Sequence, residues 1–569
     1  MNNEQILDTL QQLASLMELH GENDFKVRGY QSAIFNLEKS TAELSSLSAA
    51  ELEKLPGVGK SIAAAIYELA QSGELASLQK LREATPAGVI DMLNIKGIGP
   101  KKIRLIWKEL EIETLDDLRT ACEQHQIAKL KGFGEKTEEN ILKALIFTSA
   151  QKGKLRYADA EKLWQPLVQA LQQQFPEAKI SESGLIRRRW EVIDSILLVV
   201  GSSQSSSVRA FLNTQPNLSH HAAKSSPYYW RGEEKSRQIP LEVRFCSHEE
   251  FASVVMKTTG NGLHLHQIKN ETESLFQYLQ HTHISNEAAA YAHFGLPFIA
   301  PELREGMGET QANEATPALV ELADLKGILH NHSTYSDGKH SLEEMASYCK
   351  ALGYEYLGIS DHSKSAFYAN GLKEDRIVQQ HQEIDALNAK LAPFKILKGI
   401  ESDILNDGAL DYDDKVLASF DFIVASIHSN LKMTEQKATE RLLKAIANPY
   451  TTMLGHPTGR LLLQREGYPI DHKAVIDACA QHQVVIEINA HPWRLDLDWR
   501  WVRYALQQGV MLSINPDAHE KDGYKDMYYG LLAGRKGGLH KAMTFNALSL
   551  TEVEAYLKKK KEGKLIAAQ

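Results

Sequence analysis

The sequence predicts a multidomain chain with a helical N-terminal region, a mixed α+β middle and a C-terminal α/β barrel of seven β/α units. Three short Gly-x-Gly segments lie between helical stretches in the first 150 residues. A strand of hydrocarbon side chains follows an arginine cluster in the middle, and seven apolar runs alternate with amphipathic segments from about residue 326 onward. At about 100–200 residues per domain, 569 residues allow three to five domains.

Composition places the chain among globular proteins, with 43% hydrophobic and 24% charged residues. No apolar run approaches the ~18–20 residues that span a bilayer, and the polar N-terminus predicts no signal peptide. Four scattered cysteines without a CxxC pair predict reduced thiols in a cytoplasm, and argue against a disulfide framework and a cysteine zinc site. Because the net charge is −9, a nucleic-acid partner must be bound through local patches and backbone N–H groups.

Three N-terminal segments share one pattern: LPGVGKSIAAAI (55–66), IKGIGPKKIRLI (95–106) and LKGFGEKTEENI (130–141). The first Gly permits a tight turn, the second permits close approach of a ligand, and the helix that follows presents unpaired N–H groups. A single copy could be a helix–helix turn with Gly for geometry only, but three copies favour phosphate binding. The segments resemble helix-hairpin-helix motifs, which bind DNA backbones without reading sequence. The predicted DNA-binding residues are Gly57, Gly59, Lys60, Gly97, Gly99, Lys101, Lys102, Gly132, Gly134 and Lys136.

The seven C-terminal apolar runs all end in His, Asp, Glu or Asn. They are GILHNHS (327–333), YLGISDHS (356–363), ILKGIESD (396–403), FIVASIHS (422–429), TTMLGHP (451–457), VVIEINAHP (484–492) and VMLSINPDAH (510–519). Continuous apolar runs are typical of parallel strands buried by helices. Functional residues at the carboxyl ends of such strands are typical of the active site of a β/α barrel.

These strand ends carry metal ligands in quantity. A lone histidine on an apolar strand is usually a core residue, but six histidines and three acids at the same relative place argue against that reading. Imidazole and carboxylate without thiolate suit Mn, Zn or Fe, and the count fits two or three ions. Such a cluster activates water and neutralises both oxygens of a phosphoester displacement. The candidate ligands are His330, His332, Asp337, His362, Glu401, His428, His456, Asp517 and His519.

The segments HNHSTYSDG, SDHS, GIESDIL, SIHS, GHP and PDAHE resemble the PHP (polymerase and histidinol phosphatase) phosphoesterase superfamily over roughly 326–569. The resemblance implies three ligand sets, of which the first is His330, His332, Glu401 and Asp517. The second shares Glu401 with His428 and His456, and the third is Asp337, His362 and His519. Arg494, in NAHPWRLD, is a candidate phosphate ligand, with a surface salt bridge as the alternative. Glu401, Asp517 and Arg494 are the candidate catalytic residues.

With helix-hairpin-helix repeats in front and a PHP domain behind, nearly the whole chain resembles the bacterial family X DNA polymerases of the PolX type. TGNGLHLHQIK (259–269) and FGLPFIAPELREG (294–306) are similar to thumb segments of that family. The resemblance implies a helix-hairpin-helix region at 1–150, a nucleotidyltransferase-like palm and thumb at 151–306, a linker at 307–325 and the PHP domain at 326–569.

The palm departs from the family pattern, which has Gly-Ser, paired arginines, Asp-x-Asp and a third Asp on a later strand. Here we align the Asp-x-Asp with Asp194-Ser195-Ile196 and the third acid with Glu242, while Arg187 and Arg188 match the arginines. Because isoleucine cannot bind metal, we expect the polymerase site to be inactive or nearly so. The alternative is that Glu191 substitutes for the lost acid.

The resemblance therefore implies a cytoplasmic, nucleoid-associated DNA-repair nuclease, a 3′–5′ exonuclease that uses Mn²⁺ or Zn²⁺ (Fe being possible). Mg²⁺ is expected only if the polymerase site works. The expected partner is DNA, single-stranded, gapped or at 3′ ends, bound without sequence preference, and no membrane is expected. Two alternatives stay open: an active gap-filling DNA polymerase, and a small-molecule phosphatase.

Overall fold

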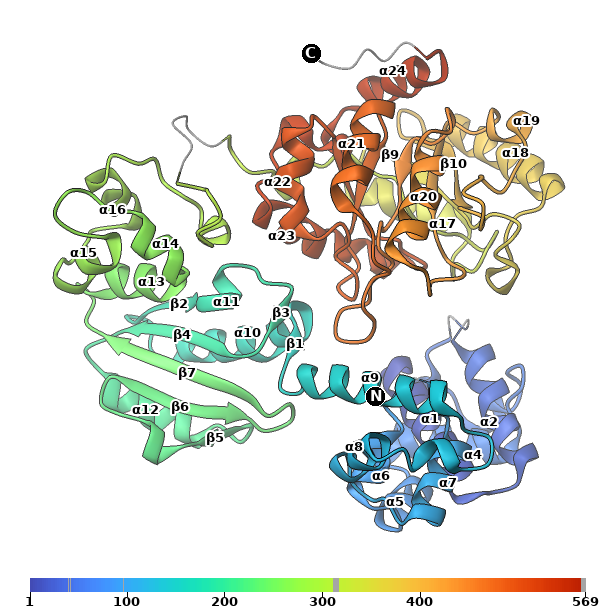
Figure 1. The fold of residues 1–569 in the computed structure, drawn as a ribbon, viewed down its shortest axis with the longest axis horizontal. Coiled ribbons are helices and arrows are strands. Elements are labelled where there is room, and N and C mark those ends of the chain that lie inside the picture. The colour runs from blue at the N-terminus through green and yellow to red at the C-terminus, as the bar shows by residue number, and fades with distance from the viewer. Residues whose placement is uncertain (39, 41, 96, 311–316, 564–569) are drawn as a thin grey trace. The chain divides into compact units, whose positions relative to one another are not determined.

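A computed structural model describes residues 1–569 except 39, 41, 96, 311–316 and 564–569 (Figure 1). The chain divides into two compact units, 1–152 and 153–569. The predicted boundaries at 306 and 325 within the second unit stay predictions, and residues 311–316 of the predicted linker lie outside the described residues.

The first unit is helical, as predicted, and its helices pack around one hydrophobic core. Each of the three Gly-x-Gly segments has the same geometry. The first glycines, Gly57, Gly97 and Gly132, have φ of 79°, 97° and 84°, which favours glycine over any other residue. The second glycine immediately precedes α4, α7 or α9, and none of these helices has a side-chain cap. The helices are α1 Asn3–His20, α2 Asp24–Leu37, α3 Ala49–Leu52, α4 Lys60–Ser72, α5 Ala76–Glu83, α6 Ala87–Met92, α7 Pro100–Leu110, α8 Leu115–Glu123 and α9 Glu135–Gln151.

The second unit begins with the predicted palm, a five-stranded sheet in the order β2-β4-β7-β6-β5. β4 and β7 are parallel, and the other neighbouring pairs are antiparallel. β1 and β3 form a separate two-stranded antiparallel ribbon. The elements are β1 Leu155–Arg156, α10 Tyr157–Gln174, β2 Lys179–Ser183, α11 Gly184–Arg187, β3 Val192–Ile193, β4 Ile196–Gly201, α12 Ser205–Thr214, β5 Leu218–His220, β6 Tyr229–Glu234 and β7 Ile239–Cys246.

Four short helices form the predicted thumb, which has a hydrophobic cluster of its own. They are α13 Phe251–Thr259, α14 Gly262–Gln267, α15 Leu275–His281 and α16 Glu287–His293. A buried polar network supports the cluster: His264 contacts Glu309 at 2.7 Å and Tyr291 at 2.8 Å.

The C-terminal part confirms the seven predicted β/α units. Its seven parallel strands follow the chain in the order β8 to β14, and a parallel bridge between Asn331 and Ala518 brings the two edges together into a nearly closed barrel. The strands are β8 Gly327–Ile328, β9 Tyr356–Ile359, β10 Lys395–Asp403, β11 Phe422–Ser426, β12 Met453–Leu454, β13 Val485–Asn489 and β14 Leu512–Asn515. The helices are α17 Leu342–Ala351, α18 Glu374–Leu391, α19 Asp414–Leu417, α20 Glu435–Ile446, α21 His472–His482, α22 Trp499–Gln507, α23 Met527–Lys536 and α24 Leu550–Lys561.

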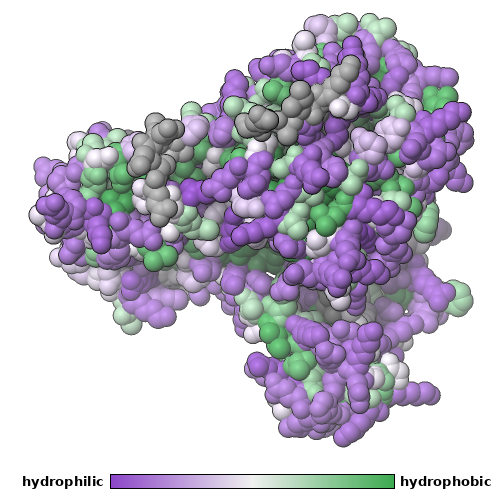
Figure 2. Space-filling model, turned by 45° about the horizontal axis from the view of Figure 1, so that its top comes forward, coloured by the Kyte–Doolittle hydropathy of each residue, from purple (hydrophilic) through white to green (hydrophobic). Residues whose placement is uncertain are grey.

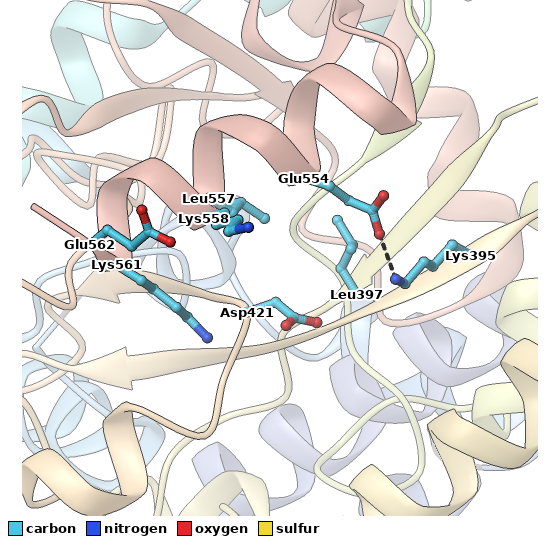
Figure 3. Close-up of a pocket in the computed structure, with 8 residues that line it drawn as sticks. All are labelled: Lys395, Leu397, Asp421, Glu554, Leu557, Lys558, Lys561 and Glu562. Atoms are coloured by element: carbon cyan, nitrogen blue, oxygen red, sulfur yellow. Dashed lines mark hydrogen bonds and ion pairs between the residues drawn. The ribbon is translucent and has the colours of Figure 1, made fainter. Parts of the chain in front are cut away.

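Helix α24 covers the amino ends of the barrel strands. Its Val553 and Leu557 belong to the same buried cluster as Leu397 of β10 and Phe422 of β11. The pocket in Figure 3 lies along this helix and is lined by charges of both signs, among them Lys395, which pairs with Glu554. The carboxyl ends, where the predicted ligands stand, are at the opposite end of the barrel.

No helix within the described part of the chain is long and apolar enough to cross a membrane. On the face that Figure 2 shows, hydrophilic side chains predominate and hydrophobic ones are scattered.

Candidate metal centre

All nine predicted ligands meet at the carboxyl ends of the barrel strands. His330 and His332 follow β8, and their i, i+2 spacing directs both imidazoles to one side, as predicted. Glu401 lies in β10, and the other ligands follow β9, β11, β12 and β14, apart from Asp337 in the loop after β8. Asp517 has φ of 53°, in a region that few residues other than glycine adopt, and strain of this kind is often found at functional sites.

Glu401 is the centre of the cluster. It is fully buried, and its Oε1 lies 3.3 Å from His330 Nε2, 3.2 Å from His428 Nε2 and 3.0 Å from His456 Nε2. Its Oε2 lies 2.9 Å from His362 Nδ1. One carboxylate therefore faces four imidazoles that come from four different strands.

The remaining ligands extend the cluster on both sides of His332. Its Nε2 lies 3.0 Å from Asp517 Oδ1, and its Nδ1 lies 3.9 Å from Asp337 Oδ1. His519 Nε2 lies 3.4 Å from Asp337 Oδ1. Within the described residues, three groups have donor atoms close enough to share an ion: His332, Asp337, His362 and His519; His330, His332 and Asp517; His362, Glu401 and His428. This grouping resembles the predicted sets, although His332 and His362 each belong to two groups.

The donor atoms fit divalent cations. His330 Nε2 and Glu401 Oε2 are buried without a hydrogen-bond partner, which is costly unless another group satisfies them. His428 Nε2 and His456 Nε2 lie 3.3 Å apart, where two imine nitrogens facing each other would repel unless a proton or a cation lay between them. A donor set of nitrogen and carboxylate oxygen suits Mn, Zn or Fe.

Charge in the cluster is strongly coupled. Burial opposes ionisation of Glu401, but His428, His330 and His362 outweigh it and hold its pKa well below the ordinary value. Burial likewise lowers the pKa of His428, yet Glu401 and Asp403 raise it to about 10. Glu401 and His428 thus stabilise each other's charged form. Metal ligation requires neutral imidazole, so bound cations would take over this stabilisation and release the protons.

Two carboxylates that were not predicted from the sequence lie behind the candidate ligands. His330 Nδ1 contacts Glu487 at 2.6 Å, and His428 Nδ1 contacts Asp403 at 2.5 Å. A ligating histidine usually donates its other N–H to such an acceptor, which sets its tautomer and orientation. Glu487 and Asp403 each lie within one of the seven apolar runs. An acid within such a run, besides the candidate ligands, was therefore the signal by which the sequence could have identified them.

Arg494 reaches this cluster. Its Nε lies 3.7 Å from Asp517 Oδ2, and about a fifth of its side chain is exposed. It therefore has a contact with a candidate ligand and also access to solvent, as a phosphate ligand requires.

Comparison with known proteins places this geometry in a family. A helix-hairpin-helix domain matches residues 1–75, a SAM-like helix-hairpin-helix tandem matches 89–145, and a PHP domain matches 329–491. The DNA polymerase/3′-5′ exonuclease PolX of Bacillus subtilis is 37% identical over 98% of this chain and 100% of its own length. The chain belongs to the PolX family.

Other relatives match a smaller part of this PolX-family chain. A probable phosphatase of Acetivibrio thermocellus is 27% identical over 41% of the chain and 95% of its own length. A probable phosphatase of Escherichia coli is 32% identical over 28% of the chain and 62% of its own length.

The structure corrects the predicted alignment of the palm acids. Leu197 of β4, not Ile196, lies directly opposite Glu242 of β7, and residues that face each other across a ladder share one face of the sheet. Ile196 is 2% exposed and points into the core on the other face, while Asp194 is exposed. The predicted alignment of β4 was therefore shifted by one residue. A shift of one residue moves every side chain of a strand to the opposite face of the sheet.

Glu242 is already neutralised. Its two oxygens accept from Arg231 at 2.6 Å and from Arg244 at 2.7 Å. Burial raises its pKa, but the bonds from Arg244 and Arg231 outweigh this and lower it. The carboxylate on this face of the palm is therefore engaged within the protein.

The arginine cluster and Glu191 also have other partners than those expected. Arg187 makes two hydrogen bonds to Glu287, and Arg188 donates to Glu305 at 2.9 Å, so both arginines join palm to thumb. Glu191 accepts from Trp499 at 2.9 Å in the barrel. Arg187, Arg188 and Glu191 are therefore engaged by other parts of the protein, and the alternative that Glu191 replaces a lost palm acid is not supported.

Proposed function

We propose that this chain is a DNA-repair nuclease whose barrel hydrolyses DNA phosphodiesters in the 3′ to 5′ direction. The observation that carries the proposal is the convergence of nine imidazole and carboxylate ligands around Glu401 at one barrel mouth. The name of the Bacillus subtilis relative, which includes a 3′-5′ exonuclease, supports the same activity. We further propose that the protein acts in the cytoplasm, associated with the nucleoid.

Two or three divalent ions, Mn²⁺ or Zn²⁺, held by the nine ligands would supply Lewis-acid stabilisation of the charge on the phosphoester. The protein's own residues would orient the metal ligands and the substrate. Glu487 and Asp403 fix the tautomers of His330 and His428. Arg494 binds a phosphate oxygen and orients the scissile group, because guanidinium matches phosphate geometry.

The three Gly-x-Gly turns bind DNA backbones in this proposal. Nothing lies within 4 Å of a Cβ added at Gly59, Gly99 or Gly134, so a phosphate can approach the helix N-termini that follow. Lys101 is less available for DNA phosphates than predicted, since its Nζ pairs with Asp24 at 3.1 Å.

Binding through phosphates predicts a steep salt dependence of DNA affinity. Replacing Lys60 and Lys136 with glutamine should reduce the slope of log affinity against log salt by about 1.4, at about 0.7 per phosphate contact on a single strand. Fluorescence anisotropy of a labelled single strand at several salt concentrations measures this slope. Lys390→Gln, an exposed cation at the carboxyl end of α18, is the matched control and should leave the slope unchanged. An unchanged slope in the double variant would show that Lys60 and Lys136 do not contact DNA phosphates.

We propose that the polymerase site is inactive, because Leu197 stands opposite Glu242 on the face where a strand acid was expected, and Glu242 is paired with arginines. No dNTP should be incorporated at a one-nucleotide gap with Mg²⁺ or Mn²⁺. Primer extension on a gapped duplex measures this, with a gap-filling polymerase as positive control. Extension that disappears in Glu242→Ala would instead identify an active gap-filling polymerase.

A small-molecule phosphatase is the second candidate, and the probable phosphatases among the relatives of this chain favour it. On the nuclease proposal, p-nitrophenyl phosphate should be turned over at least about a hundredfold less efficiently than a DNA 3′ end, because binding energy from the remote DNA is lost. Comparing kcat/KM for the two substrates decides between them, and equal values would favour the phosphatase.

A further inference from the structure

Arg494 stands on the loop between β13 and α22, and the palm supports this loop from outside the barrel. The Arg156 guanidinium of β1 lies 4.6 Å from the ring centroid of Trp493, the neighbour of Arg494. Trp190 of the palm packs edge-to-face on Trp499, at the start of α22, with ring centroids 5.7 Å apart. The middle of the loop and the first residue of α22 are therefore in contact with palm side chains.

A series of ion pairs starts at Glu191 in the palm. One Glu191 oxygen accepts from Trp499 Nε1 at 2.9 Å, and the other accepts from an Arg500 NH group at 2.7 Å. The same Arg500 nitrogen donates to both oxygens of Asp498, at 3.0 Å and 2.9 Å. Asp498 in turn accepts from Arg460 of the loop after β12.

The series ends on the backbone that carries the candidate phosphate ligand. Arg460 Nε donates to the carbonyl oxygen of Arg494 at 2.8 Å, and Arg460 also donates to the carbonyl oxygen of Leu495. The Arg494 side chain then reaches to 3.7 Å from Asp517. Charge-assisted bonds thus connect Glu191 to Arg494 in four steps.

Most of this series is shielded from solvent, while Arg500 is partly exposed. Glu191 is 8% exposed, the side chains of Asp498 and Arg460 are 17% and 14% exposed, and that of Arg500 is 38% exposed. Without the Glu191 charge, Arg500 keeps only Asp498 as its charged partner in this series, so its guanidinium moves towards Asp498 or into solvent. Because Asp498 and Arg460 are shielded, they must then adjust their own hydrogen bonds.

We infer that Glu191 is a positioning residue that holds Arg494 at the metal centre, so that the palm serves the hydrolytic reaction of the barrel. This inference rests on the proposed nuclease function. It gives the palm a role that needs none of the polymerase acids, and it assigns Glu191 to phosphodiester hydrolysis rather than to nucleotidyl transfer.

A double-mutant cycle on the full chain tests the inference. Glu191→Gln should lower the efficiency of Mn²⁺-dependent removal of 3′ nucleotides from a labelled single strand by about tenfold, since small misplacements of an orienting group cost one to two powers of ten. It should change the same parameter, kcat or KM, that Arg494→Ala changes. In the Arg494→Ala background, Glu191→Gln should have an effect below about twofold, because coupled residues are not additive.

Glu161→Gln is the matched control. Glu161 of α10 also joins palm to barrel, through Tyr528 at 3.2 Å and Tyr529 at 3.1 Å, but it has no link to the loop. Activity should be unchanged in this variant. As a readout independent of activity, backbone hydrogen exchange in 491–498 should be about tenfold faster in Glu191→Gln and unchanged in Glu161→Gln.

Each contrary result has a distinct meaning. Equal losses from Glu191→Gln in the wild-type and Arg494→Ala backgrounds would overturn the positioning role, as would unchanged exchange in the loop. Equal losses of activity in Glu161→Gln and Glu191→Gln would show that any damage to the contact between palm and barrel lowers activity, and would contradict a specific role of Glu191. A wild-type protein that hydrolyses no DNA would refute the proposed function, and the inference with it.

Discussion

Replacing Glu401 with glutamine should abolish shortening of DNA from its 3′ end, with a loss of about a thousandfold or more. Glu401 faces four imidazoles at 2.9–3.3 Å, so its loss would affect four candidate ligands at once. Loss of one preorganised electrostatic group at a reaction centre typically costs about 10²–10³ in rate, and here metal retention is also lost. The measurement uses 5′-labelled single-stranded and gapped DNA with Mn²⁺, beside metal content by mass spectrometry.

The control for this prediction is Asp194→Ala, which alters an exposed palm residue that has no contact with the centre. It should shorten DNA at the wild-type rate. Shortening that persists in Glu401→Gln would place the nuclease outside the barrel. Loss of shortening in Asp194→Ala would show that the palm performs the reaction.

Replacing Glu287 with glutamine should lower the free energy of unfolding of the palm and thumb by about 3–5 kcal/mol, the usual cost of breaking a buried ion pair. Glu287 neutralises two arginines, Arg187 at 2.6 Å and the fully buried Arg304 at 2.8 Å. Both guanidinium groups would lose a charge partner. Pulse proteolysis in urea measures the change, and Glu343→Ala, at an exposed pair with Lys390, should cost less than about 1 kcal/mol.

The contribution of Glu287 to the free energy of unfolding should depend on pH. Burial raises the pKa of Glu287, but the bonds and charges of Arg187 and Arg304 outweigh it and lower the pKa from 4.5 to about 2. The unfolded chain therefore binds this proton first, and the contribution to stability is complete above pH 4.5 and is lost as the pH falls towards 2. The difference between wild type and Glu287→Gln should shrink over that window. A difference that stays constant would show that the arginines are held by other groups.

Much of the barrel and its site could be predicted because both follow from short-range pattern. Seven apolar runs became seven parallel strands, since buried strands must be apolar along their whole length. The carboxyl ends of such strands meet at one mouth, so residues at those ends converge whatever the details of packing. Glu401 and His456, 55 positions apart, were placed together by this rule alone.

The partners of polar groups in the palm could not be predicted in this way. Whether Arg187 meets a phosphate or Glu287 depends on where the thumb folds back, 100 residues later along the chain. The register of β4 against β7, which puts Leu197 beside Glu242, depends on which face packs on the core, and a shift of one residue reverses the answer.

By itself the sequence determined that a PHP barrel of seven strands follows helix-hairpin-helix motifs, and it supplied the nine candidate ligands, because periodicity and strand ends are local properties. Only the tertiary structure decided that Glu487 and Asp403 stand behind the histidines, that the palm arginines are engaged with the thumb, and that Glu191 connects to the loop of Arg494. The physical reason is that a charged side chain takes its partner from whatever segment packs against it, and that choice is made by the whole fold.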